Sequence, residues 1–156
     1  MTPQIVAAKP DSTDATALIA ERDAHLGSRG YPQASRHGYS VEKLLREAVA
    51  FFVARCDGVA AGCGGVQLHG ADCAELKRMY VRRAFRGQGL GKSLLSHLAE
   101  YAQQRGAAVL RLETGIYEQA AMGLYESFGF ERSPPFGEYR EDPFSLYYEK
   151  RLTQVR

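Results

Sequence analysis

Short apolar runs alternate with amphipathic stretches along the chain, and the pattern opens with a strand and a helix. Gln4–Ala8 is apolar enough for a strand, and the side chains of Asp11–Asp14 can cap a helix over Ala15–Leu26. Gly, Pro, Ser and Tyr crowd Gly27–Ser40, which is typical of a long loop, and a short helix is expected over Val41–Glu47. Because long loops in compact domains are often functional, this loop is a candidate for binding.

Two longer apolar runs then predict a hairpin. Ala50–Cys56 and Val59–Leu68 are separated by Asp57-Gly58, a dipeptide favoured in tight hairpin turns. Cys73–Val81 alternates imperfectly as a further strand and leads directly into a glycine-rich segment. Three consecutive strands are therefore expected in the middle of the chain.

The remaining part of the chain mixes helical and strand patterns. Apolar residues recur at helical spacing up to Gly106 and again up to Gly129, and glycine commonly ends a helix. The elements expected are a helix, a strand, a shorter helix and two final strands, over Leu90–Ala102, Val109–Thr114, Ala120–Phe128, Phe130–Ser133 and Ser145–Arg151.

The bulk composition is that of one globular domain. With 156 residues, of which 45% are hydrophobic, the chain can bury a core as a single domain over 1–156. Its net charge of +2 comes from interspersed acidic and basic residues, a pattern that gives no nucleic-acid footprint. The sequence has neither an export signal at its start nor an apolar run long enough to cross a bilayer, so a soluble, cytoplasmic protein without a membrane partner is expected.

The cysteines and histidines form no metal or disulfide pattern. Cys56, Cys63 and Cys73 contain no C-x-x-C pair and lie in apolar surroundings, so buried free thiols are expected. None of them has the neighbouring base that a nucleophilic cysteine needs. The histidines are scattered without H-x-x-x-H spacing, so no metal is predicted.

The segment FRGQGLGKS, Phe85–Ser93, is the main candidate for a ligand site. A nucleotide P-loop ending in GKS would need glycine where Arg86 stands, and a dinucleotide loop would need its last glycine where Lys92 stands. The pattern R-x-x-G-x-G fits instead, with backbone N–H groups holding a pyrophosphate at the positive end of a helix dipole. The residues expected to hold the phosphates are Arg86, Gly87, Gln88, Gly89, Leu90, Gly91, Lys92 and Ser93.

Three segments together resemble a known family. Glu75–Val81 (ELKRMYV), the loop RGQGLG and Leu124–Phe130 (LYESFGF) are similar, in order and spacing, to the GCN5-related N-acetyltransferases, or GNAT family. The resemblance runs from about Val49 to Leu152 in element order. It implies an α/β (α+β) fold with a mixed, mostly antiparallel sheet of about seven strands, splayed at its centre and flanked by about four helices. The cosubstrate that it implies in the opening of the sheet is acetyl-CoA.

The resemblance also implies how acetyl-CoA is held and cleaved. The backbone of Met79, Tyr80 and Val81 would bind the pantetheine arm, and the Val81 N–H would polarise the thioester carbonyl. Tyr125 matches the tyrosine that protonates the departing thiolate. By helical spacing alone Tyr125 also fits a core aromatic, and both interpretations remain open.

The general base has two candidates. Glu75 and Glu113 both match positions where family members carry a base, and each is equally open to being a carboxylate paired with a neighbouring cation. One departure from the family stands seven residues before Tyr125, where many members have an asparagine that binds the CoA arm. This chain has Glu118 there, followed by Gln119.

The activity implied is direct transfer of the acetyl group from acetyl-CoA to a primary amine in a ternary complex. The alternatives are acetylation of a protein N-terminus or lysine, and a non-catalytic acyl-CoA sensor. A phosphotransferase is disfavoured because its P-loop would need glycine in place of Arg86. The oligomeric state is open, with a homodimer among the options.

Aromatic residues in two expected loops favour a small pocket and therefore a small-molecule amine. These candidate substrate-binding residues are Tyr31, Tyr39, Phe136 and Tyr139. Carboxylates that can attract a cationic amine lie in the second loop, at Glu138, Glu141 and Asp142.

Overall fold

The computed structural model describes residues 3–35 and 39–152, which fold around one seven-stranded sheet. Part of the expected loop over Gly27–Ser40, residues 36–38, lies outside the described residues. In chain order the elements are β1 (Gln4–Ala7), α1 (Thr13–Ser28), η1 (Gln33–Ser35), α2 (Val41–Arg46), β2 (Ala50–Cys56), β3 (Val59–His69), β4 (Cys73–Val81), η2 (Arg83–Phe85), α3 (Leu90–Gln104), β5 (Val109–Gly115), α4 (Gln119–Ser127), β6 (Glu131–Ser133) and β7 (Ser145–Arg151).

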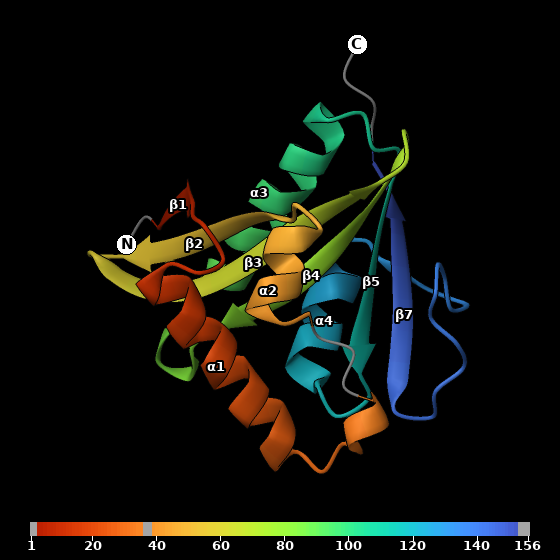
Figure 1. Ribbon diagram of the computed structural model, residues 1–156, viewed down its shortest axis with the longest axis horizontal. Coiled ribbons are helices and arrows are strands. Elements are labelled where there is room, and N and C mark those ends of the chain that lie inside the picture. The colour runs from red at the N-terminus through yellow and green to blue at the C-terminus, as the bar shows by residue number, and fades with distance from the viewer. Residues whose placement is uncertain (1–2, 36–38, 153–156) are drawn as a thin grey trace.

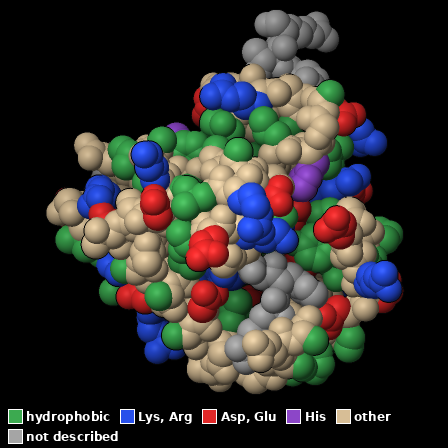
Figure 2. Space-filling model, in the orientation of Figure 1, with side chains coloured by type: hydrophobic (Ala, Val, Ile, Leu, Met, Phe, Trp, Pro, Cys, Tyr) green, Lys and Arg blue, Asp and Glu red, His purple; other side chains and the backbone are tan. Residues whose placement is uncertain are grey.

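The helices cover both faces of the sheet, as Figure 1 shows, with α1 and α2 on the near face and α3 and α4 on the far face. The core under α3 contains Leu94, Leu95 and Leu98, all fully buried. Each contributes roughly 1.5–3 kcal/mol by its removal from water. On the near face, the core under α1 and α2 is smaller and includes Leu18 and Leu44. The near surface carries interspersed acidic and basic side chains (Figure 2), as the sequence predicts.

The sheet is antiparallel except at one place, where it opens. The strand order is β1-β2-β3-β4-β5-β7-β6, and β4 with β5 is the parallel pair. In the described structure this pair holds only from Cys73 to Glu75 on β4, opposite Val109–Arg111 on β5. Beyond that point the two strands diverge, and Arg78 interrupts β4 with a φ of 55°. A mixed, mostly antiparallel sheet splayed at its centre is therefore confirmed.

Local sequence signals explain the element ends. Ser12 caps α1, since its Oγ accepts a hydrogen bond from the Ala15 N–H at 3.3 Å. Asp57 and Gly58 both have positive φ, 51° and 78°, as a tight hairpin turn between β2 and β3 requires. The cysteines are free, as expected, with Cys56 and Cys63 buried and Cys73 half-buried.

The first helix is longer than the sequence predicts. It continues through Gly27 to Ser28, into the segment expected to be a loop. In the last turn of this helix the His25 side chain bonds to Glu118, just before α4, a tertiary contact that the local sequence does not show. Tyr31, also expected on a loop, is only 4% exposed.

Candidate active site

The opening between β4 and β5 contains a cleft of about 460 Å³, here called the cofactor cleft. Its walls come from the end of β4, the glycine loop, β5, α4 and one face of α1. The expected cofactor-binding residues in its wall are Met79, Tyr80, Val81, Arg86, Gly87, Gly89, Leu90, Gly91 and Lys92. Gln88 and Ser93 are in the same loop but are not part of this wall in the described structure, and the Gln88 amide instead donates to the Ala84 carbonyl at 3.5 Å.

Backbone conformation gives the glycine loop its shape. Gly87 and Gly89 have φ values of 78° and 82°, which other residues rarely adopt. Gly89 is the N-cap of α3, and the first bond of that helix in the described structure runs from the Ser93 N–H to the Gly89 carbonyl. The N–H groups that precede Ser93 are therefore available to an anion, at the positive end of the helix dipole. This arrangement suits a pyrophosphate.

The exposed edge of β4 supplies the second part of the cleft. The Arg82 N–H donates to the Ala61 carbonyl on β3 at 2.9 Å. Since antiparallel partners alternate between bonded and non-bonded pairs, the N–H and C=O of the preceding Val81 point away from β3. They face the side where β5 has already diverged, and the Val81 carbonyl accepts a bond from Arg86 Nε at 2.9 Å. The Val81 N–H thus points into the cleft.

Tyr125 contributes both to the core and to the cleft wall. Its ring, on α4, packs against Phe130 and Tyr148 with centroid distances of 5.8 and 6.2 Å. The side chain is 7% exposed and borders the cofactor cleft. Burial raises the pKa of Tyr125 to about 12, while the Arg22 guanidinium acts in the opposite direction. The phenol therefore keeps its proton at neutral pH and remains a hydrogen-bond donor.

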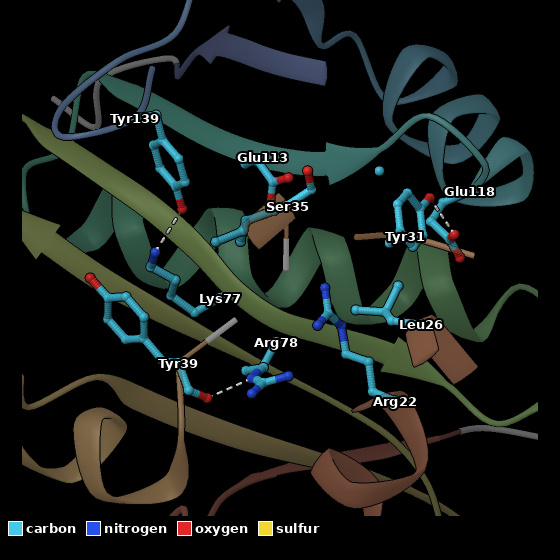
Figure 3. Close-up of a pocket in the computed structure, with 12 residues that line it drawn as sticks. Arg22, Leu26, Tyr31, Ser35, Tyr39, Lys77, Arg78, Glu113, Glu118 and Tyr139 are labelled. Carbon is cyan, nitrogen blue, oxygen red and sulfur yellow. Dashed lines mark hydrogen bonds between the residues drawn. The ribbon is translucent and has the colours of Figure 1, made fainter. Parts of the chain in front are cut away.

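A second pocket of about 40 Å³ shares Arg22, Leu26 and Glu113 with the wall of the cofactor cleft and is here called the junction pocket. Figure 3 shows the residues that line it. Its polar lining includes Arg22, Tyr31, Tyr39, Lys77, Glu113 and Tyr139. Beyond Tyr39, Lys77 and Tyr139 it meets a wider outer pocket of about 980 Å³, whose wall includes Phe136, Glu138, Glu141 and Asp142. The four expected substrate-binding aromatics therefore line these two pockets.

The two candidate bases lie in different pockets. Glu113, near the end of β5, lines both the cofactor cleft and the junction pocket, and its Oε2 accepts a hydrogen bond from Ser145 Oγ at 2.7 Å. Glu75 is 4% exposed, lies on β4 and faces the outer pocket. The structure thus separates two residues that the sequence ranks equally.

Glu75 belongs to a buried cluster with Lys77 and Tyr139. Its Oε2 lies 2.7 Å from Lys77 Nζ and accepts a hydrogen bond from the Tyr139 hydroxyl, also at 2.7 Å. Lys77 Nζ in turn donates to that hydroxyl at 3.0 Å and sits 3.8 Å from the centre of the Tyr39 ring. Burial lowers the pKa of Lys77, and burial together with the Glu75 carboxylate raises the pKa of Tyr139. The cluster joins β4 to the segment between β6 and β7.

Glu118 has a structural explanation that the sequence did not reveal. It bonds to His25 Nε2 at 2.8 Å and to the Tyr31 hydroxyl at 2.7 Å. The same hydroxyl accepts the Tyr117 N–H at 2.8 Å. These contacts tie the end of α1 and Tyr31 to the start of α4, at the border of the cofactor cleft and the junction pocket.

Arg22 is a site residue that sequence reasoning missed. It lines the cofactor cleft and the junction pocket, and its Nε donates to the Met79 carbonyl at 3.4 Å. A signal was present, because Leu18, Arg22 and Leu26 are four residues apart and so share one face of the helix. A cation within that inward-facing stripe marks a functional position.

Among the described residues, 3–35 and 39–152, no group of three or more His, Cys, Asp or Glu side chains is arranged to hold a metal ion. A search of the same residues finds no helix both long and apolar enough to span a membrane.

A splayed sheet with a glycine loop at the start of a helix and an exposed strand edge fits a CoA-dependent acyltransferase. The model of the acetyltransferase (GNAT) family matches residues 17–130. The chain belongs to this family and is an acetyl-CoA-dependent N-acetyltransferase that acts on an amine. This confirms the resemblance carried by the three sequence segments.

Relatives and solved structures agree with this membership. The chain is 36% identical over 108 residues to the IAA acetyltransferase of Azospirillum brasilense, covering 69% of this chain and 70% of that protein. It is 37% identical over 109 residues to the uncharacterized N-acetyltransferase YsnE of Bacillus subtilis, covering 69% and 72%. A Klebsiella pneumoniae structure described as an acyl-CoA N-acyltransferase has a TM-score of 0.83 and 34% identity, covering 97% of this chain and 99% of that one. PaiA N-acetyltransferase of Thermoplasma acidophilum, solved with coenzyme A, has a TM-score of 0.77 at 21% identity, covering 97% and 100%.

Proposed function

We propose that the enzyme acetylates the primary amine of a small molecule by direct attack in a ternary complex. The observation that carries this proposal is the junction pocket, which opens on the cofactor cleft and has a volume of only about 40 Å³. Its walls include the rings of Tyr31, Tyr39 and Tyr139. A small aromatic pocket of this size suits the amine end of a small molecule better than a protein chain lying in a groove.

The donor side fits acetyl-CoA through backbone groups. The amides at the start of α3 hold the pyrophosphate, with Arg86 and Lys92 adding positive charge. The N–H of Val81 donates to the thioester carbonyl, whose oxygen gains negative charge as the amine attacks. Acetyl-CoA supplies the activated acyl group, and the protein holds it at the end of the junction pocket.

Proton transfer is assigned to Glu113, which lines both the cleft and the junction pocket, and to Tyr125, which lines the cleft. The amine nitrogen forms a bond to the carbonyl carbon, the carbon–sulfur bond breaks, and the amine loses a proton. Glu113 takes that proton, directly or through a water molecule, because it lines both the cleft and the junction pocket. Tyr125 donates to the departing sulfur. Glu75 is instead a positioning residue, since its carboxylate is engaged by Lys77 and Tyr139.

The experiment that tests this proposal measures CoA release with a panel of acceptors. Purified enzyme is given acetyl-CoA with polyamines, amino acids, aminoglycosides or short peptides. At least one small amine should be acetylated with a kcat/KM more than about tenfold above that of any peptide. Faster acetylation of a peptide terminus or lysine would transfer the assignment to protein acetylation. CoA binding without turnover of any acceptor would favour the sensor alternative.

A further inference from the structure

Three buried side-chain atoms in the described part of the chain have no hydrogen-bond partner. They are Arg22 Nη1, Gln67 Oε1 and Arg111 Nε. All three residues line the pockets on the acceptor side, Arg22 in the junction pocket and the other two in the outer pocket. Since native proteins pair nearly all buried polar atoms, each of these exceptions needs a partner that the described residues do not supply, such as water or a bound ligand. Arg111 Nε has a carboxylate of Glu149 at 3.7 Å, whereas Arg22 Nη1 is a cationic donor with no such partner.

The other charged groups of the junction pocket already have partners, including Glu113, whose Oε2 accepts a hydrogen bond from Ser145 Oγ at 2.7 Å. Lys77 contacts Glu75, and Arg78 contacts Asp23 and donates to the Tyr39 carbonyl at 2.6 Å. Of the acids, Glu118 is bound by His25 and Tyr31. The proximity of Arg22 also contributes to lowering the pKa of Arg78, after burial, so positive charge is crowded at this place. An anionic group on the ligand would relieve that crowding.

The position of Arg22 determines which part of the acceptor it can reach. Its Nε is held by the Met79 carbonyl on the exposed edge of β4 at 3.4 Å. Figure 3 shows its guanidinium raised from α1 into the pocket, with Leu26 beside it. A ligand group on Nη1 would therefore lie next to the point where β4 presents the thioester. That group must be separated from the reacting amine by very few bonds.

From this placement we infer, on the basis of the proposed function, that the acceptor is an amino acid whose carboxylate binds Arg22. The junction pocket has room for about three water-sized groups, which matches a carboxylate and its carbon. An α-amino acid carries its amine on the next carbon, within reach of Glu113. Its side chain extends past Tyr39 and Tyr139 into the outer pocket.

The test compares matched acceptors that differ only in the carboxylate. The probes are phenylalanine, leucine, lysine and glutamine, each with its carboxamide and its decarboxylated amine. Wild-type enzyme should prefer the free amino acid in at least one series by on the order of 10²-fold in kcat/KM, because a site built for a charged group rejects the analogue that lacks it. In Arg22→Met that preference should collapse toward 1, and Arg22→Lys should keep part of it because the charge remains. Arg46→Met removes an exposed arginine of α2 and should keep the wild-type preference.

A binding measurement tests the carboxylate site even if none of the probes is acetylated. Calorimetric titration of the same probes into the enzyme saturated with CoA should show tighter binding of the free amino acid to wild type and no such difference in Arg22→Met. Equal binding of acid and amide to wild type would overturn the inference while leaving acetylation of other amines intact. An Arg22→Met enzyme that loses rate equally with every acceptor, with a raised KM for acetyl-CoA, would also overturn it, since Arg22 would then serve the donor. Tight, carboxylate-selective binding with no acetyl transfer would uphold the site and reject the proposed function.

Discussion

The cofactor cleft and the two acceptor pockets are adjacent but are built in different ways. The phosphate and thioester contacts that we propose for the cleft come from the backbone of one short stretch, from Met79 to Lys92. The acceptor pockets are built from side chains of segments far apart in the sequence, such as Arg22, Tyr39, Glu113 and Tyr139. Backbone groups depend on the local conformation, whereas each side chain must be specified separately.

This difference indicates which substitutions should affect acetyl-CoA binding and which should change the choice of acceptor. In the cleft, we expect substitution to be most damaging at Gly87 and Gly89, whose positive φ other residues rarely adopt. In the acceptor pockets a single side chain can change the substrate, because each supplies a contact that the backbone does not. The predictions below test this division, beginning with the residue that is proposed to protonate the leaving sulfur.

The largest effect is expected for Tyr125→Phe, which removes one hydroxyl and keeps the ring. The rate constant kcat should fall on the order of 10²-fold or more while the KM for acetyl-CoA stays the same, because the hydroxyl acts only as the sulfur leaves. With a pKa of about 12, Tyr125 should cause no loss of kcat up to about pH 10.

A matched control for Tyr125 is Tyr148→Phe. The Tyr148 ring packs against that of Tyr125, its hydroxyl donates to Glu126 at 2.6 Å, and neither Tyr148 nor Glu126 lines the cleft. This variant should lose about 1 kcal/mol of unfolding free energy and keep its kcat. Turnover of Tyr125→Phe within twofold of wild type would return Tyr125 to the role of a core aromatic.

The two glutamates give the next effect and separate the two regions most directly. Glu113→Gln should lower kcat by about 10²-fold, since the amide cannot accept the amine proton. Glu75→Gln should raise the acceptor KM with a smaller change in kcat, because it disturbs Lys77 and Tyr139 in the outer pocket. Steady-state kinetics with one good acceptor distinguish them, and a larger loss of kcat in Glu75→Gln would exchange their roles.

Local signals made most of the fold predictable. The hairpin turn at Asp57-Gly58, the stop at Gly106 and the periodic apolar face of α3 depend on neighbouring residues, and the elements that they predict lie where expected. The last turn of α1 depends on His25 meeting Glu118, which is 93 residues away. A contact of that range leaves no local pattern.

The same distinction holds for the site. The glycine loop is contiguous, so its register can be compared with known phosphate loops by sequence alone. The cluster of Glu75, Lys77 and Tyr139 joins residues 62 to 64 positions apart, and Arg22 meets Met79 from 57 positions away. The sequence therefore offered both Glu75 and Glu113 as bases, and only their positions in the folded chain distinguish them.

A third effect concerns the backbone-built side alone. Acetyl-CoA at about 100 times its dissociation constant should stabilise the wild-type fold by roughly 2.7 kcal/mol, and ATP with Mg²⁺ should have little effect. Gly89→Val should abolish this gain, because its φ of 82° is the one that presents the α3 amides. Gly70→Val is the matched control: its φ is 69°, a Cβ there would also meet no atom within 4 Å, and it lies in the β3–β4 turn. Gly70→Val should melt at a lower temperature than wild type but should still be stabilised by acetyl-CoA to the full extent. If both variants lost this stabilisation, or if ATP stabilised the wild type equally, the backbone conformation at Gly89 would not be what binds the phosphates.

The smallest effects are expected in the outer pocket, from Tyr139→Phe and Phe136→Ala. Tyr139→Phe removes one hydroxyl from the cluster but leaves the direct contact between Lys77 and Glu75 at 2.7 Å, so it should raise the acceptor KM about threefold to tenfold, the value of one net hydrogen bond. Phe136→Ala removes a ring packed against that of Tyr139 at 5.1 Å and should have an effect of similar size. In both variants the KM for acetyl-CoA should remain unchanged, because neither side chain borders the cofactor cleft. If the acceptor kinetics of both variants stayed at wild-type values, the acceptor would not enter the outer pocket. The side chains that determine acceptor specificity would then be those of the junction pocket alone.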